Sequence, residues 1–348
     1  MKLSFRWYGD DDPVTLEKIR QIPNMHTIVT AVYDVPPGEV WSEASIKHLK
    51  DRIEENGLHF EVVESVPVHE DIKLGKPTRD HYIANYIENL RRLSKYGVKC
   101  VCYNFLPIFD WIRTQTDKRL PDGSTALVCY ADQLAKMDPL KDDFTLPGWD
   151  ASYSREDMKE LFAEYDKLSE EDIWANYKYF LEKVIPYAEQ YDIKMGIHPD
   201  DPPYPIFGTK RIIKCEKDID RALALVDSPY NGLTLCTGAL GCVKTNDVAK
   251  LVRKYAEMGR IHFMHIRNVK VLENGSFEET AHFSECGSLD MVGIIKALHD
   301  NHYEGYARPD HGRMIWGETG KPGYGLYDRA LGASYITGVW DALDKAGL

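Results

Sequence analysis

Features that mark several common protein classes are missing from this chain of 348 residues. The N-terminal segment has no apolar region followed by a cleavage site, so we expect no secretory signal. No apolar run reaches the roughly 20 residues that a membrane span requires. Lysine and arginine total 43 against 55 for aspartate and glutamate, which gives a net charge of −12. This acidic balance argues against nucleic acids and anionic membranes as partners.

Disulfide and nucleotide-binding signals are also absent. Seven cysteines are scattered along the chain without a CxxC pair. An odd number without a regular framework indicates reduced thiols, so we expect a cytoplasmic protein. No glycine-rich phosphate loop follows the first predicted strand, which argues against an open nucleotide-binding sheet. The hydrophobic content of 43% and charged content of 28% are typical of a globular protein with an ample core.

Eight short segments rich in Val, Ile, Tyr and Phe have the composition of strands that are buried on both faces. They are residues 2–7, 27–33, 59–66, 98–105, 194–198, 232–236, 260–266 and 304–308. Nearly all are joined through amphipathic helical patterns. Such alternation implies parallel strands, and eight units close as a (β/α)8 TIM barrel. A doubly wound open sheet is the alternative.

Two insertions interrupt this alternation, at about residues 107–153 after the fourth strand and 268–289 after the seventh. The Pro-Asp-Gly turn at 121–123 predicts a hairpin in the first, and the second has a turn at Asn274-Gly275. Both insertions lie on βα loops, the face where barrels hold their active sites. We therefore expect lids or site walls within a single domain, residues 1–348.

Potential metal ligands stand at the ends of the last four predicted strands: His198, Cys236, His265 and Asp310. A lone strand cysteine is usually a small hydrophobic residue, and a lone histidine or aspartate is usually only hydrogen-bonded. A parallel barrel, however, brings these four ends to one mouth. Such a set suits Zn, Fe(II) or Mn(II). Strand alternation places His262 on the opposite face from His265, so His262 is expected to pack elsewhere.

Arginines recur at the same strand ends, where they could bind a small anionic, polyhydroxylated substrate. Candidate substrate contacts are Arg6 with Trp7, Arg267 with Asn268, and Arg308 and Arg313 beside Asp310. Ordinary salt bridges are the alternative for each arginine, and Trp7 could equally be a hydrophobic wall. Asp200 and Asp201 either orient His198 or cap their loop, with the loop cap favoured for Asp201.

Motifs spread over the chain resemble the mannonate dehydratase family, cytoplasmic enzymes of hexuronate breakdown that are similar to xylose-isomerase-like TIM barrels. The resemblance rests on FRWYGDDDPVTL (5–16), GEVWS (38–42), ESVPVHEDIKLG (64–75), IHPDDPP (197–203), LTLCTGALG (233–241), IHFMHIRNV (261–269), RPDHGR (308–313) and KPGYG (321–325). It implies dehydration of D-mannonate to 2-dehydro-3-deoxy-D-gluconate with Mn²⁺ or Fe²⁺. It assigns the metal to the same four strand-end residues.

The same resemblance implies that His311 and Tyr324 are the catalytic groups and that the protein is a homodimer. Which of the two side chains is the base stays open at this level. Two other functions also remain open. A metal-dependent sugar ketol-isomerase or epimerase would use a similar ion on neutral substrates. A non-catalytic sugar-acid-binding protein would keep the metal for structure alone.

Overall fold

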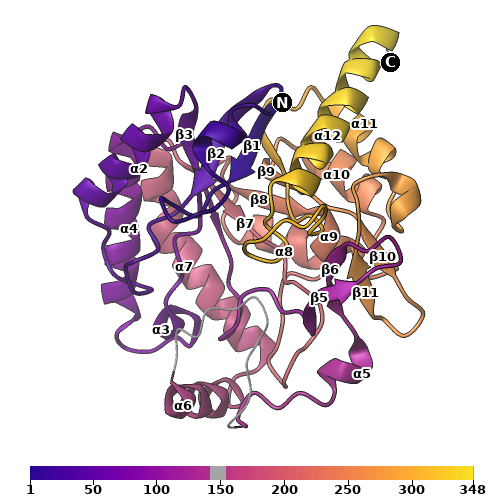
Figure 1. Cartoon of the computed structure of the whole chain (residues 1–348). Coiled ribbons are helices and arrows are strands. Elements are labelled where there is room, and N and C mark those ends of the chain that lie inside the picture. The colour runs from indigo at the N-terminus through magenta and orange to yellow at the C-terminus, as the bar shows by residue number, and fades with distance from the viewer. Residues whose placement is uncertain (142–153, 348) are drawn as a thin grey trace.

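A closed barrel of eight parallel strands forms the centre of the computed structural model, which describes residues 1–141 and 154–347 (Figure 1). The spatial order is β1-β12-β9-β8-β7-β4-β3-β2, and each neighbouring pair is parallel. The strands are β1 (Lys2–Arg6), β2 (Met25–Thr30), β3 (His59–Glu64), β4 (Cys100–Tyr103), β7 (Lys194–Ile197), β8 (Asn231–Cys236), β9 (Ile261–Ile266) and β12 (Tyr306–Pro309). Each overlaps one of the eight predicted segments, so the predicted (β/α)8 barrel is confirmed.

Helices surround the barrel (Figure 1). The longer ones are α2 (Glu43–Glu55), α4 (Arg79–Lys95), α6 (Arg155–Tyr165), α7 (Glu170–Gln190), α8 (Glu216–Leu225), α10 (Val248–Glu257), α11 (Met291–Asp300) and α12 (Tyr327–Ala346). Short turns form α1 (Leu16–Ile19), α3 (Glu70–Lys73), α5 (Ala131–Leu134), α9 (Thr237–Gly241) and the 3-10 helix η1 (Ser284–Cys286). In the described part of the chain, no helix combines the length and the apolar character needed to cross a membrane.

Helix α2 illustrates why the sequence forms these elements. The Ser42 hydroxyl accepts a hydrogen bond from the backbone N–H of Ser45 and so caps the first turn. Ile46 and Ile53 lie fully buried on one face of the helix. The helix ends before Gly57, whose φ of +73° is readily adopted only by glycine.

The two insertions meet in a second, four-stranded sheet with the order β10-β11-β6-β5 (Figure 1). The first insertion contributes the antiparallel hairpin β5 (Gln115–Arg119) and β6 (Thr125–Cys129), and the second contributes β10 (Val269–Val271) and β11 (Phe277–Glu279). The hairpin predicted around residues 121–123 is thus confirmed, although residues 142–153 lie outside the described part. The pairing of β11 with β6, which joins the two insertions, is not predictable from either segment alone.

Apolar side chains fill the structure in two clusters. The larger lies between the barrel and its helices, and the smaller fills the barrel interior with Val29, Val62, Cys100, Cys102, Phe263 and Tyr306. At the carboxyl end of β9, the interior changes from apolar to polar, because the Phe263 ring packs edge-on against the His265 ring at a centroid distance of 4.6 Å. The packed interior therefore forms the floor of a site at the carboxyl ends of the strands.

Candidate metal centre and active site

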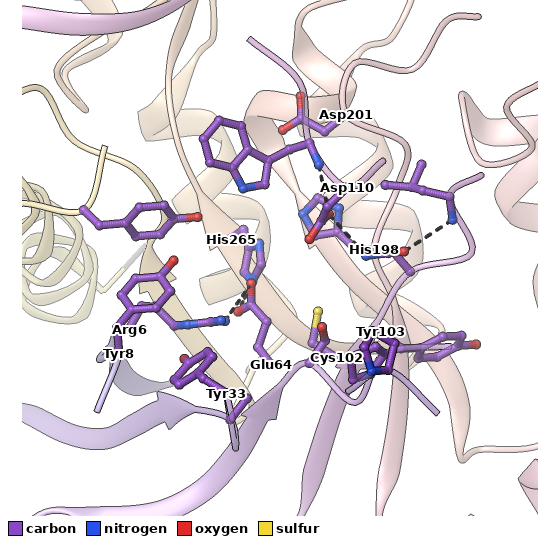
Figure 2. A pocket seen from close by; sticks show the side chains of 18 of the residues that line it. Arg6, Tyr8, Tyr33, Glu64, Cys102, Tyr103, Asp110, His198, Asp201 and His265 are labelled. Atoms are coloured by element: carbon purple, nitrogen blue, oxygen red, sulfur yellow. Dashed lines mark hydrogen bonds and ion pairs between the residues drawn. The ribbon is translucent and has the colours of Figure 1, made fainter. Parts of the chain in front are cut away.

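A cavity of about 620 Å³ lies at the carboxyl ends of the barrel strands (Figure 2). Residues at or just after these strand ends line it, among them Arg6, Glu64, Asn104, His198, His265 and Asp310. Trp111 of the first insertion and Tyr324 of the loop before α12 also contribute to its wall. The cavity is thus built where the sequence predicted a site.

Three of the four predicted metal ligands converge closely. One ligand atom each from His198, Cys236 and His265 lies within 4.8 Å of the other two. The side chains come from the residue after β7, the last residue of β8 and the inward face of β9. His262, on the opposite face of β9, instead places Nδ1 2.9 Å from the carbonyl oxygen of Met195. The expectation that His262 packs away from the site is therefore confirmed.

Asp310, directly after β12, joins this group. Its Oδ2 lies 3.6 Å from the Cys236 sulfur, and its Oδ1 lies 3.7 Å from Nδ1 of His265. Burial on its own would raise the pKa of this carboxyl, yet the neighbouring His311, Arg308 and Arg267 hold its pKa well below the usual range. Asp310 is therefore ionised and available as an oxygen ligand.

The chemistry of these donors fits a divalent cation. Nδ1 of His265 is buried and has no hydrogen-bond partner within residues 1–141 and 154–347, and burial with the Arg308 charge lowers the pKa of His265 to about 4, so that the imidazole is neutral. Nδ1 of His198 lies 2.6 Å from the carbonyl oxygen of Pro199 and donates to it, which leaves Nε2 with a free lone pair. Burial raises the pKa of the Cys236 thiol well above its usual range. A bound cation would reverse that preference and stabilise the thiolate.

A second possible group, Glu64, Cys102 and His265, is less suited to a metal. Burial and the neighbouring Glu64 charge both raise the pKa of the Cys102 thiol. Cys236, in contrast, receives hydrogen bonds from the backbone N–H of Ala239 at 3.4 Å and from Arg267 Nη2 at 3.6 Å. Because these donors favour a thiolate, the group that contains Cys236 fits a divalent cation better than the group that contains Cys102.

Glu64, the last residue of β3, was not singled out from the sequence. Its Oε2 lies 3.1 Å from Nε2 of His265, while its Oε1 lies 3.0 Å from Arg308 Nη2 and 3.2 Å from Arg6 Nη1 (Figure 2). Nε2 of His265 therefore points at a carboxylate and Nδ1 points at the metal group. The third predicted segment runs to Val66, so the strand-end rule that identified the metal ligands did not reach Glu64, with which β3 ends in the structure.

His311 and Tyr324, the predicted catalytic pair, are in direct contact. Nε2 of His311 lies 2.9 Å from the Tyr324 hydroxyl, and both side chains line the cavity. On the other side of the ring, Nδ1 of His311 lies 2.8 Å from Oε2 of Glu279, the last residue of β11. His311 is thus displaced from the ligand group, although it directly follows Asp310.

Behind this pair lies a fully buried ionic cluster of two arginines and two carboxylates, Arg113, Asp201, Arg267 and Glu279. Asp201 contacts Arg113 Nη1 at 2.9 Å and Arg267 Nη2 at 2.8 Å, so it is not the loop cap that its sequence context favours. Arg113 comes from the first insertion and Glu279 from the second. The sequence around Arg113 or Glu279 does not indicate its partner, because each contact joins segments that are far apart in the chain.

This cluster corrects the assignment of Arg267 as a substrate contact. Its side chain is 1% exposed, and it does not line the cavity. The guanidinium is occupied by Asp201 and Glu279, and its Nε lies 3.4 Å from Oδ2 of Asp310. Arg267 therefore supports the site from behind.

Three further predicted substrate contacts, Trp7, Asn268 and Arg313, are not among the described residues that line the cavity. Trp7 points away from the mouth into the core around the barrel, since strand alternation directs its neighbour Arg6 inward. The amide of Asn268 is bonded to backbone groups of the second insertion. Arg313 is paired with Asp328 at 2.9 Å and with Asp122 at 2.8 Å. Arg6 and Arg308 are the members of the predicted set that line the cavity.

A barrel whose strand ends carry a His, Cys and carboxylate group defines an enzyme of the metal-dependent (β/α)8 class. A solved D-tagatose 3-epimerase-like protein shares this fold, with a TM-score of 0.58 at 12% identity over 100% of both chains. The chain belongs to the D-mannonate dehydratase (UxuA) family, whose model matches residues 1–347.

Individual members of that family are similar over their whole length. Mannonate dehydratase from Streptococcus agalactiae serotype V is 54% identical over 345 residues, which is 99% of each chain. The crystal structure of mannonate dehydratase from Streptococcus suis serotype 2 gives a TM-score of 0.92 at 48% identity, covering 100% of this chain and 95% of that one.

Proposed function

We propose that this chain removes water from D-mannonate to form 2-dehydro-3-deoxy-D-gluconate, as its family membership implies. The observation that carries the proposal is the His311–Tyr324 contact of 2.9 Å directly beside the metal group. A dehydratase needs two proton-transferring groups on one substrate, whereas a binding protein needs none. The cavity of about 620 Å³ is large enough for a six-carbon sugar acid.

We assign the metal to His198, Cys236, His265 and Asp310, and we propose Mn²⁺ or Fe²⁺ as the ion. When bound, such an ion supplies a Lewis acid for the negative charge that develops next to the substrate carboxylate. The mixed nitrogen, sulfur and oxygen donors accept either ion. Metal analysis of the purified protein identifies which one is present.

The reaction removes the proton on C2 and the hydroxyl group on C3, and the resulting enol converts to the 2-keto acid. We propose that His311 takes the C2 proton and that Tyr324 protonates the departing hydroxyl. Burial raises the pKa of Tyr324 well above its usual range, which supports a neutral phenol that donates its proton. A histidine is suited to the base because imidazole accepts a proton near neutral pH.

Arg6 is the proposed contact for the substrate carboxylate. It lines the cavity, and its buried Nε has no hydrogen-bond partner among the described residues. Its Nη1 pairs with Glu64 at 3.2 Å, which holds the guanidinium in place at the mouth. A carboxylate that accepted from Nε would satisfy this buried donor.

The test is to incubate Mn²⁺-loaded protein with D-mannonate and to follow the 2-keto acid as its semicarbazone. Chelator-treated protein is the control for metal dependence. We expect keto-acid formation only with the metal. Interconversion of an aldose and a ketose without keto-acid formation would instead identify an isomerase, and binding without turnover would identify a sugar-acid-binding protein.

Two further proposals rest on the family resemblance together with the cysteine pattern and the insertion at residues 107–153. We propose that the protein is cytoplasmic and that it forms a homodimer. Light scattering coupled to gel filtration measures the mass of the particle. A mass equal to one chain across a range of concentrations would reject the dimer.

A further inference from the structure

Both nitrogens of the His311 ring have polar neighbours, and the two neighbours of Nδ1 impose opposite requirements on its protonation. Nε2 lies 2.9 Å from the Tyr324 hydroxyl. Nδ1 lies 2.8 Å from Oε2 of Glu279 but also 2.7 Å from Arg267 Nη1. A guanidinium nitrogen only donates and a carboxylate only accepts. A neutral imidazole carries one N–H, so Nδ1 either donates to Glu279 or accepts from Arg267.

The hydrogen-bond partners of Glu279 decide between the two arrangements. Its Oε1 accepts from Arg113 Nε at 2.8 Å, Arg113 Nη2 at 2.6 Å and Arg267 Nη1 at 2.9 Å. Its Oε2 has one close polar neighbour among the described residues, Nδ1 of His311. If Nδ1 accepted from Arg267, this buried carboxylate oxygen would be left without a donor, which is costly. In the other arrangement Arg267 Nη1 keeps its hydrogen bond to Oε1, and the cost is a 2.7 Å contact between two donors, Nη1 and Nδ1.

We propose that Glu279 is a positioning residue for the dehydration: it holds the N–H of His311 on Nδ1 and so leaves Nε2 as the atom that receives the C2 proton. This inference rests on the proposed function. A carboxylate that fixes the tautomer and orientation of a basic histidine has the same effect in serine hydrolases.

The arrangement also closes the proton cycle. The C2 proton moves to Nε2 of His311, and the electron pair of the C2–H bond forms the C2–C3 double bond. The C3–O bond breaks, and the proton of Tyr324 leaves with the hydroxyl as water. The tyrosinate then recovers a proton from Nε2 across the 2.9 Å contact, so both side chains return to their starting states. The N–H on Nδ1 stays with Glu279 throughout.

The second insertion presents Glu279 to the site by strand alternation. In β11, Phe277 and Glu279 lie on one buried face, while Glu278 points to the other side. Residues Phe277 and Cys129 pair β11 with β6 of the first insertion, and Arg113 of that insertion reaches Oε1 of Glu279. Both insertions therefore contribute to the position of one carboxylate behind His311.

The substitution Glu279→Gln tests the inference. Three N–H donors converge on Oε1, so the amide oxygen must take that place and the amide NH₂ must face Nδ1. The variant therefore forces Nδ1 to accept and moves the ring proton to Nε2. Asp201→Asn is the matched control, since Asp201 pairs with the same two arginines and is equally buried, with 3% exposure for each carboxylate side chain.

The first readout is the tautomer itself. Spectra of ¹⁵N-histidine-labelled, Zn²⁺-loaded protein distinguish a protonated Nδ1 from a protonated Nε2, and the His311→Asn variant assigns the signals. We expect the proton on Nδ1 in the unsubstituted chain and in Asp201→Asn, and on Nε2 in Glu279→Gln. A proton on Nε2 in the unsubstituted chain would overturn the inference without any need for a variant.

The second readout is turnover of D-mannonate by Mn²⁺-loaded protein, normalised to the folded, metal-bound fraction. We expect kcat of Glu279→Gln to fall by about 100-fold or more, as for a misdirected general base, with KM changed only a few-fold. Equal kcat values for the Glu279→Gln and Asp201→Asn variants would show that Glu279 acts only through the charge of the cluster. Failure of the unsubstituted chain to form keto acid would reject the proposed function instead, and the tautomer measurement would still stand.

Discussion

Replacing Glu64 with glutamine tests how the chain orients a metal ligand without touching the ligand set. Burial opposes ionisation of this carboxyl, but Arg308, His265 and Arg6 hold its pKa well below the usual range. The ionised carboxylate accepts from Nε2 of His265 at 3.1 Å and from Arg308 at 3.0 Å. It thereby keeps the N–H of His265 on Nε2 and the lone pair of Nδ1 directed at the metal group.

A glutamine at position 64 cannot accept hydrogen bonds both from His265 and from the two arginines, Arg308 and Arg6. If its oxygen faces Arg308 and Arg6, its NH₂ faces Nε2 of His265 and favours the tautomer whose Nδ1 bears the proton. If its oxygen faces His265, its NH₂ opposes two guanidiniums. Loss of such an outer partner typically lowers metal affinity by about 10- to 100-fold. Because both orientations leave a conflict, we expect the upper end, about 100-fold, which is about 2.7 kcal/mol.

The assay is a titration of metal-free protein with Mn²⁺ in competition with a chelator of known affinity. Glu61→Gln is the matched control on the same strand, because Glu61 pairs with Lys2 at 3.1 Å and has no contact with the metal group. Its affinity for Mn²⁺ should stay within about twofold of the unsubstituted chain, since such partly exposed pairs contribute little. Equal Mn²⁺ affinity of Glu64→Gln and Glu61→Gln would refute the argument.

Three other substitutions test, one at a time, a metal ligand, a proton-transferring group and a packing contact. His311→Asn should retain one equivalent of metal but lose turnover, and metal analysis that finds none would contradict this division of roles. Cys236→Ser should lose metal, because a neutral hydroxyl replaces the thiolate, and stoichiometric metal after dialysis would argue against sulfur as a ligand. Gly238→Ala should lower the free energy of unfolding by about 1–3 kcal/mol, as overpacking does. An ideal Cβ on Gly238 would lie 2.0 Å from Nε of Arg267, whose guanidinium is held in place, and urea unfolding that shows no change would contradict this reasoning.

The barrel was predictable because its signals are local. Each strand is a short β-rich segment, and most of the longer helices have a cap or a glycine stop, as Ser42 and Gly57 show for α2. Once eight alternating units are counted, topology places His198, Cys236 and His265 at one end without any knowledge of side-chain contacts. Glu64 escaped this step because the third predicted segment extends two residues beyond the end of β3, to Val66.

Partners that come from distant segments were not predictable. Glu279 lies in a sequence of ordinary acidic character, and its role depends on the pairing of two insertions separated by more than a hundred residues. The roles of the arginines were not predictable for a related reason. A guanidinium at a strand end can face substrate or a carboxylate of the chain, and nothing in the sequence around Arg267 or Arg313 distinguishes the two.

The arginines and carboxylates of the site together explain how a buried histidine keeps a defined orientation. A carboxylate fixes an imidazole only while it is ionised, and burial alone would protonate it. Burial opposes ionisation of both carboxyls, but Arg308, His265 and Arg6 keep Glu64 ionised, and His311, Arg267 and Arg113 lower the pKa of Glu279 to about 2. Arg6 and Arg113 therefore act on a histidine through a carboxylate, whereas Arg267 also lies 2.7 Å from Nδ1 of His311. It follows that removal of Arg113, which contacts neither histidine, should disturb His311 through Glu279 before it disturbs the metal.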